Sequence, residues 1–414
     1  MAKQTSKTYA VMTRLLTKVV RDSDKTSLTY FSGKLNCILT LDETIDVSEE
    51  YSITLYNDYL WMLLHSEAGD KHIKQKERDF SVSFSHSIVW MPGHYFLLFQ
   101  MGEVVLRFEL QMQENGNLLE SGCKLCPKYG MEYILAKRIS GKPYWNYFNS
   151  TPGLIQWKNW LIKRLQQREL NTLRAEHSLG VLPFCNNMLI ASETSDFVWR
   201  SLLLLTRLAD IKNVEERIDC SNLYGPREDY PYNKIDDIFA TERYSDKILG
   251  LELPDLKDRQ YSFHNIGMLL RPGMEGVLDK ILSHAPTYYN SVILCGTQKD
   301  IGLLRERYPE LRSKFPDSNC FSSEPAAIEE LILTFFREAE NAKIQLSPES
   351  VDRVCRLLSR KYLDGDIRNW TISDVRRYIT AQVIPSYTQR AIEAMQQGEP
   401  LEEVVNILPE DLAF

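Results

Sequence analysis

The sequence predicts a multidomain protein in which an all-β domain precedes an α/β domain and a helical C-terminal region. Short β-rich segments alternate with turns from about residue 25 to 148, after an N-terminal segment of 24 residues. Strands alternate with helices over 149–322, and helical periodicity fills 323–414. The length of 414 residues agrees with several domains, because single cores rarely exceed about 250 to 300 residues.

The strand-like segments of the β domain predict an antiparallel sandwich. The clearest is "YFLLFQMGEVVLRFELQM", in which Gly102 separates two apolar runs as in a hairpin. The stretch "WMPGHYFLLF" places a Pro-Gly turn two residues before Tyr95, an arrangement that resembles immunoglobulin-like modules. We interpret the large aromatic residues mainly as core, with a groove for a ligand or peptide as the alternative. These residues are Trp61, Trp90, Tyr95 and Trp145.

Charge and hydropathy narrow the class of protein. The net charge of -7 argues against broad nucleic-acid binding, which requires clustered Lys and Arg. The apolar runs are shorter than the roughly 20 residues that a membrane-spanning helix needs. We therefore expect a cytoplasmic protein with no membrane span and no nucleic-acid partner.

One cysteine pair has the spacing of metal ligands, Cys123 and Cys126 in "CKLC". Structural zinc usually takes four ligands from two such pairs, and the sequence has no second pair. We favour two reduced cysteines in a hairpin loop over a zinc or redox site, and we expect no metal and no cofactor.

The α/β domain is predicted to begin with the amphipathic helix "LIQWKNWLIKRLQQRELNTLRAEHSLG", with Gly180 as its stop. A strand over 188–191 and a helix over 198–211 follow. Further strands are expected near "ERIDCS", "KILGLEL" and "SVILCG", with a helix near "GVLDKILSHA". This alternation predicts a mainly parallel sheet between two layers of helices. Beyond it, Ser347 followed by Pro348 marks the start of a C-terminal helix.

Several segments of the last 260 or so residues match one family in order and spacing. They are "LRAEHSLGVLP", "ERIDCSNLYG", "SVILCGTQKDIGLLRERYPELRSKFP", "LSPES" followed by "DVRRYI", and "ILPEDLAF". The chain in this region resembles the AAA+ ATPases of the CbxX/CfqX type. The resemblance implies a phosphate-binding loop after the first strand, a metal-binding pair after the third strand and a helical lid domain at 323–414. An unrelated α/β protein is the alternative.

The resemblance places the phosphate loop in "SETSDFVW". The family's loop uses glycines, a lysine and a hydroxyl to cradle phosphates and magnesium. Here the loop has no glycine and no lysine, and Phe197 or Val198 occupies the lysine position. Acidic side chains would repel a phosphate. The degenerate loop comprises Ser192, Glu193, Thr194, Ser195, Asp196, Phe197 and Val198.

The other catalytic elements implied by the resemblance are also altered. The family has Asp-Glu after four apolar residues, whereas "KILGLELPDL" offers only the separated Glu252 and Asp255. The family's "LRSRF" is "LRSKF" here, so Arg312 is retained and Lys314 occupies the position of the arginine finger. Both are candidate intersubunit contacts.

The lid arginine of the family has two candidate positions, and the alternatives stay open. Alignment on "DVRRYI" leaves Ser373, whereas Arg368 would serve if the loop were longer.

These losses predict that the chain does not hydrolyse ATP. We expect a bacterial scaffold or adaptor that binds a protein partner through its β domain. Its AAA+-like core would form oligomers or dock with an active AAA+ paralogue. The alternative is a nucleotide sensor or ATPase with unusual site residues, either Asp219 with Ser221 or the two carboxylates of "LELPD". Asp219 and Ser221 also fit ordinary turn-capping after a strand.

Overall fold

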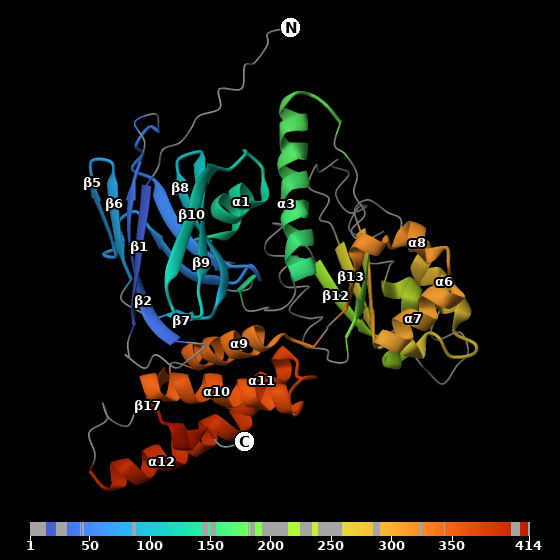
Figure 1. Ribbon diagram of the computed structural model, residues 1–414. Coiled ribbons are helices and arrows are strands. Elements are labelled where there is room, and N and C mark those ends of the chain that lie inside the picture. Colours follow the sequence, from blue (N-terminus) through green and yellow to red (C-terminus); the bar gives the residue numbers. More distant parts are fainter. Residues whose placement is uncertain are drawn as a thin grey trace. The chain divides into compact units, whose positions relative to one another are not determined.

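In a computed structural model the chain forms two compact units. One combines Met1–Ile155 with Pro325–Phe414, and the other is Gln156–Glu324. The C-terminal helices, which the resemblance implies as a lid, thus belong to the same unit as the N-terminal strands (Figure 1). The structure describes residues 14–21, 31–41, 43, 45–84, 88–142, 148–149, 155–180, 182, 187–192, 214–223, 234–238, 259–284, 290–322, 325–342, 344–398 and 406–412.

The N-terminal strands form two antiparallel sheets. The first has the order β1-β2-β6-β5, and β7 also pairs with β2. Its strands are β1 (Arg14–Arg21), β2 (Phe31–Thr40), β5 (Ile73–Lys76), β6 (Asp79–Ser83) and β7 (Ile88–Trp90). The second has the order β10-β9-β8-β3-β4. Its strands are β3 (Tyr51–Asn57), β4 (Met62–Glu67), β8 (Gly93–Met101), β9 (Val104–Met112) and β10 (Leu118–Leu125).

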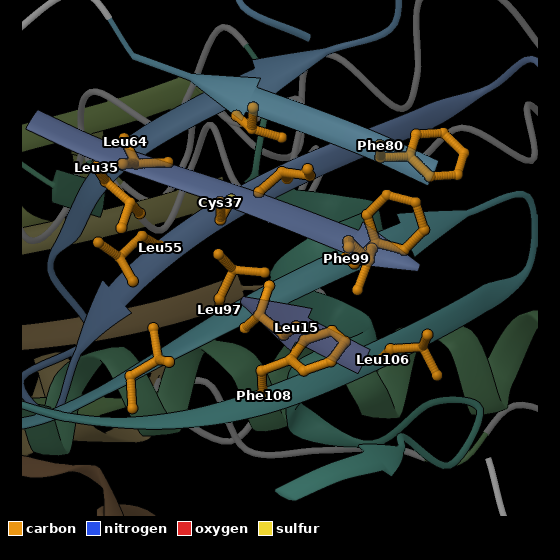
Figure 2. Close-up of a cluster of buried hydrophobic side chains, with 14 of the residues drawn as sticks. Leu15, Leu35, Cys37, Leu55, Leu64, Phe80, Leu97, Phe99, Leu106 and Phe108 are labelled. Carbon is orange, nitrogen blue, oxygen red and sulfur yellow. The ribbon is translucent and has the colours of Figure 1, made fainter. Parts of the chain in front are cut away.

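The two sheets share one hydrophobic core, which confirms the predicted antiparallel β domain. Leu35 and Cys37 of β2 lie in the same buried cluster as Leu97 and Phe99 of β8 (Figure 2). The alternate spacing of these residues puts one face of each strand into the core. The predicted hairpin is also present, because Met101 pairs with Val104 around a two-residue turn. Gly102 takes φ 53° there, a conformation that glycine adopts without strain.

A short helical segment covers the outer face of the second sheet. It consists of α1 (Met131–Ile134) and the π-helical turn η1 (Leu135–Ile139). This segment contacts β8 and β9. All seven residues of β3 are buried, and Tyr51, Ile53 and Leu55 lie in the shared core. The Tyr56 hydroxyl lies 2.7 Å from Ser140 Oγ, which links β3 to the residue after η1.

The aromatic residues singled out in the sequence are core residues where they are described. Trp61, Trp90 and Tyr95 expose 4%, 0% and 3% of their surface, so they line no open groove. Trp145 lies outside the described residues. The Tyr95 hydroxyl donates to the carbonyl oxygen of Met91 and accepts from the Met91 amide, both at 2.9 Å. It thereby fixes the corner between β7 and β8.

The C-terminal region is helical, as predicted. It contains α9 (Ile328–Asn341), α10 (Pro348–Asp364), α11 (Ile372–Tyr378), η5 (Ile379–Val383) and α12 (Ile384–Gln396). The Ser347 side chain accepts a hydrogen bond from the Ser350 amide, so the predicted start of α10 is confirmed. The chain stays helical through Pro385, because the π-helical η5 directly before it accommodates the missing amide donor. Two short parallel strands, β16 (Gln345–Leu346) and β17 (Asn406–Ile407), connect the chain end to this region.

The C-terminal helices pack against the sandwich through apolar side chains. Leu333 of α9 forms a buried cluster with Trp61 and Met91. Val89 of β7 packs against the core of the helical region. Burial of this kind contributes about 25 cal/mol for each Å² of apolar surface removed from water. The two regions are therefore joined by hydrophobic packing as well as by the chain.

The second compact unit contains a five-stranded parallel sheet of order β12-β13-β14-β11-β15. Its strands are β11 (Met188–Ala191), β12 (Val214–Asp219), β13 (Arg259–His264), β14 (Asn290–Gly296) and β15 (Cys320–Ser322). Its helices include α3 (Ile155–Glu176), α6 (Glu275–His284), α7 (Gln298–Arg307) and α8 (Leu311–Lys314), with short 3₁₀ turns η2 (Cys220–Leu223), η3 (Ile266–Met268) and η4 (Asp317–Asn319). The predicted parallel α/β region is confirmed.

The third strand of this sheet lies where the sequence analysis assigned no element. It is β13, whose only apolar side chains are Tyr261 and Phe263. Ser262 and His264 alternate with them and are also buried, so the segment has no continuous apolar run. We predicted that "KILGLEL" supplies the third strand of the sheet. That prediction was wrong, because β13 occupies the position next to β14. The segment "KILGLEL" and the predicted helix over 198–211 lie outside the described residues.

Candidate functional site

The strand order of the parallel sheet singles out one place on its carboxyl edge. β11 lies between β14 and β15, although it comes first in the sequence among the five strands of this sheet. The connections after β11 and β14 therefore run in opposite directions along the sheet. Ligands of such sheets bind beyond the carboxyl ends of the strands at this reversal. The site to inspect is thus the end of β11 with the neighbouring ends of β14, β13 and β12.

Directly after β11, Ser192 still bonds to the neighbouring strand β14. Its amide donates to the carbonyl oxygen of Gly296 at 2.8 Å, which joins the end of β11 to the end of β14. Of the predicted degenerate loop, only Ser192 is described. Glu193–Val198 lie outside the described residues.

Directly after β14, Thr297 and Asp300 form a capping box at the start of α7. Thr297 Oγ1 donates to Asp300 Oδ2 at 2.8 Å and accepts from the Asp300 amide at 3.1 Å. The Thr297 amide donates to the same carboxylate oxygen. A Cβ built on Gly267 would lie 2.5 Å from Asp300 Oδ1, so the next turn packs directly on this carboxylate. The Asp300 side chain is therefore used structurally.

At the end of β12, the Asp219 carboxylate is likewise hydrogen-bonded to neighbouring residues. Its Oδ1 accepts hydrogen bonds from Asn265 Nδ2, from the Ser221 amide and from Ser221 Oγ, at 2.9, 2.9 and 2.7 Å. Burial raises the pKa of Asp219, but the hydrogen bonds from Asn265 and Ser221 outweigh burial, so the pKa lies below its usual value. Asp219 and Ser221 form a turn cap that also ties β12 to the residue after β13.

The end of β13 carries two residues without charge at neutral pH. His264 is buried, and its Nε2 lies 3.3 Å from Ser262 Oγ. Burial, followed by the positive charge of Arg217, lowers the pKa of His264 to about 4. The next residue, Asn265, has a left-handed backbone with φ 57° that turns the chain away from the strand. The sequence analysis did not single out either residue, because it predicted the third strand elsewhere.

The structure separates the roles of the two predicted intersubunit residues. Arg312 of α8 is exposed, whereas Lys314 is half-buried. Lys314 Nζ donates to the Leu282 carbonyl oxygen at the end of α6, at 2.7 Å. The lysine at the finger position therefore has a structural partner within its own unit. Glu252 and Asp255 lie outside the described residues.

The candidate lid residues lie in the other compact unit. Arg368 is exposed in the turn between α10 and α11, and Ser373 is half-buried in the first turn of α11. The two positions thus differ in their accessibility to a ligand. This accessibility makes Arg368 the better placed of the two to meet an external group.

The cysteine pair of the β domain has no metal-binding surroundings in the described chain. Burial raises the pKa of the Cys126 thiol to about 12, so it stays protonated at neutral pH. Cys123 is half-buried at the edge of the sandwich core. Within the described residues, His, Cys, Asp and Glu side chains do not gather in any group of three or more that could hold a metal ion.

Comparisons with known proteins add no family assignment. No protein-family model matches the chain, and no curated protein matches it. In the described part of the chain, every helix is too short or too polar to cross a lipid bilayer.

Proposed function

We propose that this chain is a non-hydrolysing AAA+-like protein that serves as a scaffold or adaptor. The observation that carries the proposal is that the polar groups at the carboxyl edge of the parallel sheet are hydrogen-bonded to one another. Asp219 is held by Asn265 and Ser221, and Asp300 by Thr297. A site for phosphate and magnesium needs carboxylates and amides directed at the ligand. Here the described groups are directed at one another.

The non-hydrolysing part of the proposal draws support from the third strand. In the family that the chain resembles, this strand ends in Asp-Glu, one carboxylate for the metal and one for the attacking water. In the observed sheet the third strand, β13, ends in His264 and is followed by Asn265. Neither side chain carries negative charge at neutral pH, so neither can hold magnesium as a carboxylate does. This substitution favours a nucleotide fold without hydrolytic activity.

The recognition part of the proposal rests on the sandwich. The strand order β1-β2-β6-β5 corresponds to the ABED sheet of immunoglobulin-like domains, and β9-β8-β3 within the five-stranded second sheet corresponds to the GFC strands. Tyr95 near the start of β8 bonds back to Met91, as the tyrosine corner of such domains does before strand F. We infer an immunoglobulin-like module, a type common in protein recognition. Cys37 on β2 and Leu97 on β8 lie in the same buried cluster, and Cys37 is a free thiol, so apolar packing holds the core where antibody domains have a disulfide.

Nucleotide binding provides the decisive test. Isothermal titration of the full chain with ATP and with ADP, each with magnesium, should give no saturable heat at about 1 mM nucleotide. Binding with Kd of about 10 μM or tighter would instead favour the alternative, a nucleotide sensor or a divergent ATPase. Asp219→Asn would then test Asp219 as a metal ligand, because loss of a metal-binding carboxylate should weaken binding of the magnesium–nucleotide complex more than binding of free nucleotide.

The oligomeric part of the proposal has its own measurement. Light scattering after size exclusion should show an assembly of the chain with itself or with a co-expressed active AAA+ ATPase. Arg312 is the exposed basic residue placed to contribute to such a contact. A strict monomer that ignores AAA+ partners would exclude docking through the core and leave only recognition by the sandwich.

A further inference from the structure

We draw no further inference here: the strongest candidate, the surface patch of exposed leucines at the carboxyl end of α3, where Leu170 lies on the helix and Leu179 and Leu182 follow it, carries none, because nothing in the structure shows what covers it.

Discussion

Arg390 of α12 and Asp411 near the end of the chain form a bidentate ion pair. Arg390 Nε lies 3.0 Å from Asp411 Oδ1, and Nη2 lies 2.9 Å from Oδ2. Nη2 also donates to the Asn406 carbonyl oxygen at 2.6 Å, in β17. Asp411 is only 2% exposed, so Arg390 is the counter-ion of a carboxylate that is shielded from water.

Loss of the arginine should therefore be costly. Arg390→Met leaves a buried carboxylate without its counter-ion, and we expect a loss of about 3 to 5 kcal/mol in the free energy of unfolding. Urea denaturation measures it. Arg360→Met is the control, because Arg360 and Asp364 are both exposed and 3.8 Å apart, and it should cost less than about 0.5 kcal/mol. Equal effects of the two substitutions would show that the Asp411 pair contributes no more than a surface pair.

The corner hydroxyl of the sandwich gives a second prediction. Tyr95→Phe removes both hydrogen bonds to the Met91 backbone and leaves a buried amide and carbonyl unsatisfied. We expect a destabilisation of about 1 to 3 kcal/mol in urea denaturation. Tyr387→Phe is a matched control on α12, because its hydroxyl makes no hydrogen bond to any of the described residues. If Tyr95→Phe is as mild as the control, the corner does not hold the strands together.

The buried His264 predicts how stability changes with pH. Its pKa falls from 6.5 to about 4 on folding, so the unfolded chain binds the proton more readily. The stabilisation is fully present above pH 6.5 and is lost as the pH falls from 6.5 to 4. One pKa unit corresponds to about 1.4 kcal/mol. Because solvent screening weakens the effect, we expect the contribution of His264 to the free energy of unfolding to be about 2 kcal/mol.

The measurement is the free energy of unfolding at several pH values in the parent and in His264→Gln protein. The parent should lose more stability than the variant between about pH 6.5 and pH 4.5. Parallel curves for the two proteins would mean that His264 does not cause the loss.

The exposed Arg312 predicts an effect on assembly alone. Arg312→Glu reverses a surface charge on α8 and should reduce self-association or AAA+ docking at least about tenfold, while unfolding changes by less than about 0.5 kcal/mol. Analytical ultracentrifugation measures the extent of self-association or docking. Lys314→Met is the contrasting variant, because it frees the Leu282 carbonyl and should lower stability without a matching loss of assembly. Assembly that is insensitive to Arg312→Glu would remove Arg312 from the interface.

Local signals in the sequence predicted much of the fold. The glycine of the β8–β9 hairpin and the serine cap of α10 each act through their own neighbours, so the sequence pattern was sufficient. β13 was missed because two of its buried residues, Ser262 and His264, are polar. Their burial depends on neighbouring strands that are distant in sequence, and periodicity carries no information about these contacts.

The candidate site was predicted less completely than the fold. Ser221 lies after a strand as predicted, whereas Asp219 is the last residue of that strand, β12. Asn265, which binds Asp219, had no sequence signal. Sites built from several elements need the tertiary structure before their chemistry can be read.

The discontinuous first unit has a consequence for synthesis on the ribosome. Trp61 and Met91 emerge early, but Leu333, which packs with them, is translated only after the whole of Gln156–Glu324. The continuous second unit can fold as soon as it leaves the exit tunnel, because domains generally fold as units from the N-terminal side. The sandwich meanwhile carries an uncovered apolar patch in the growing chain. Truncation before α9 should therefore yield a nascent protein that depends on chaperones.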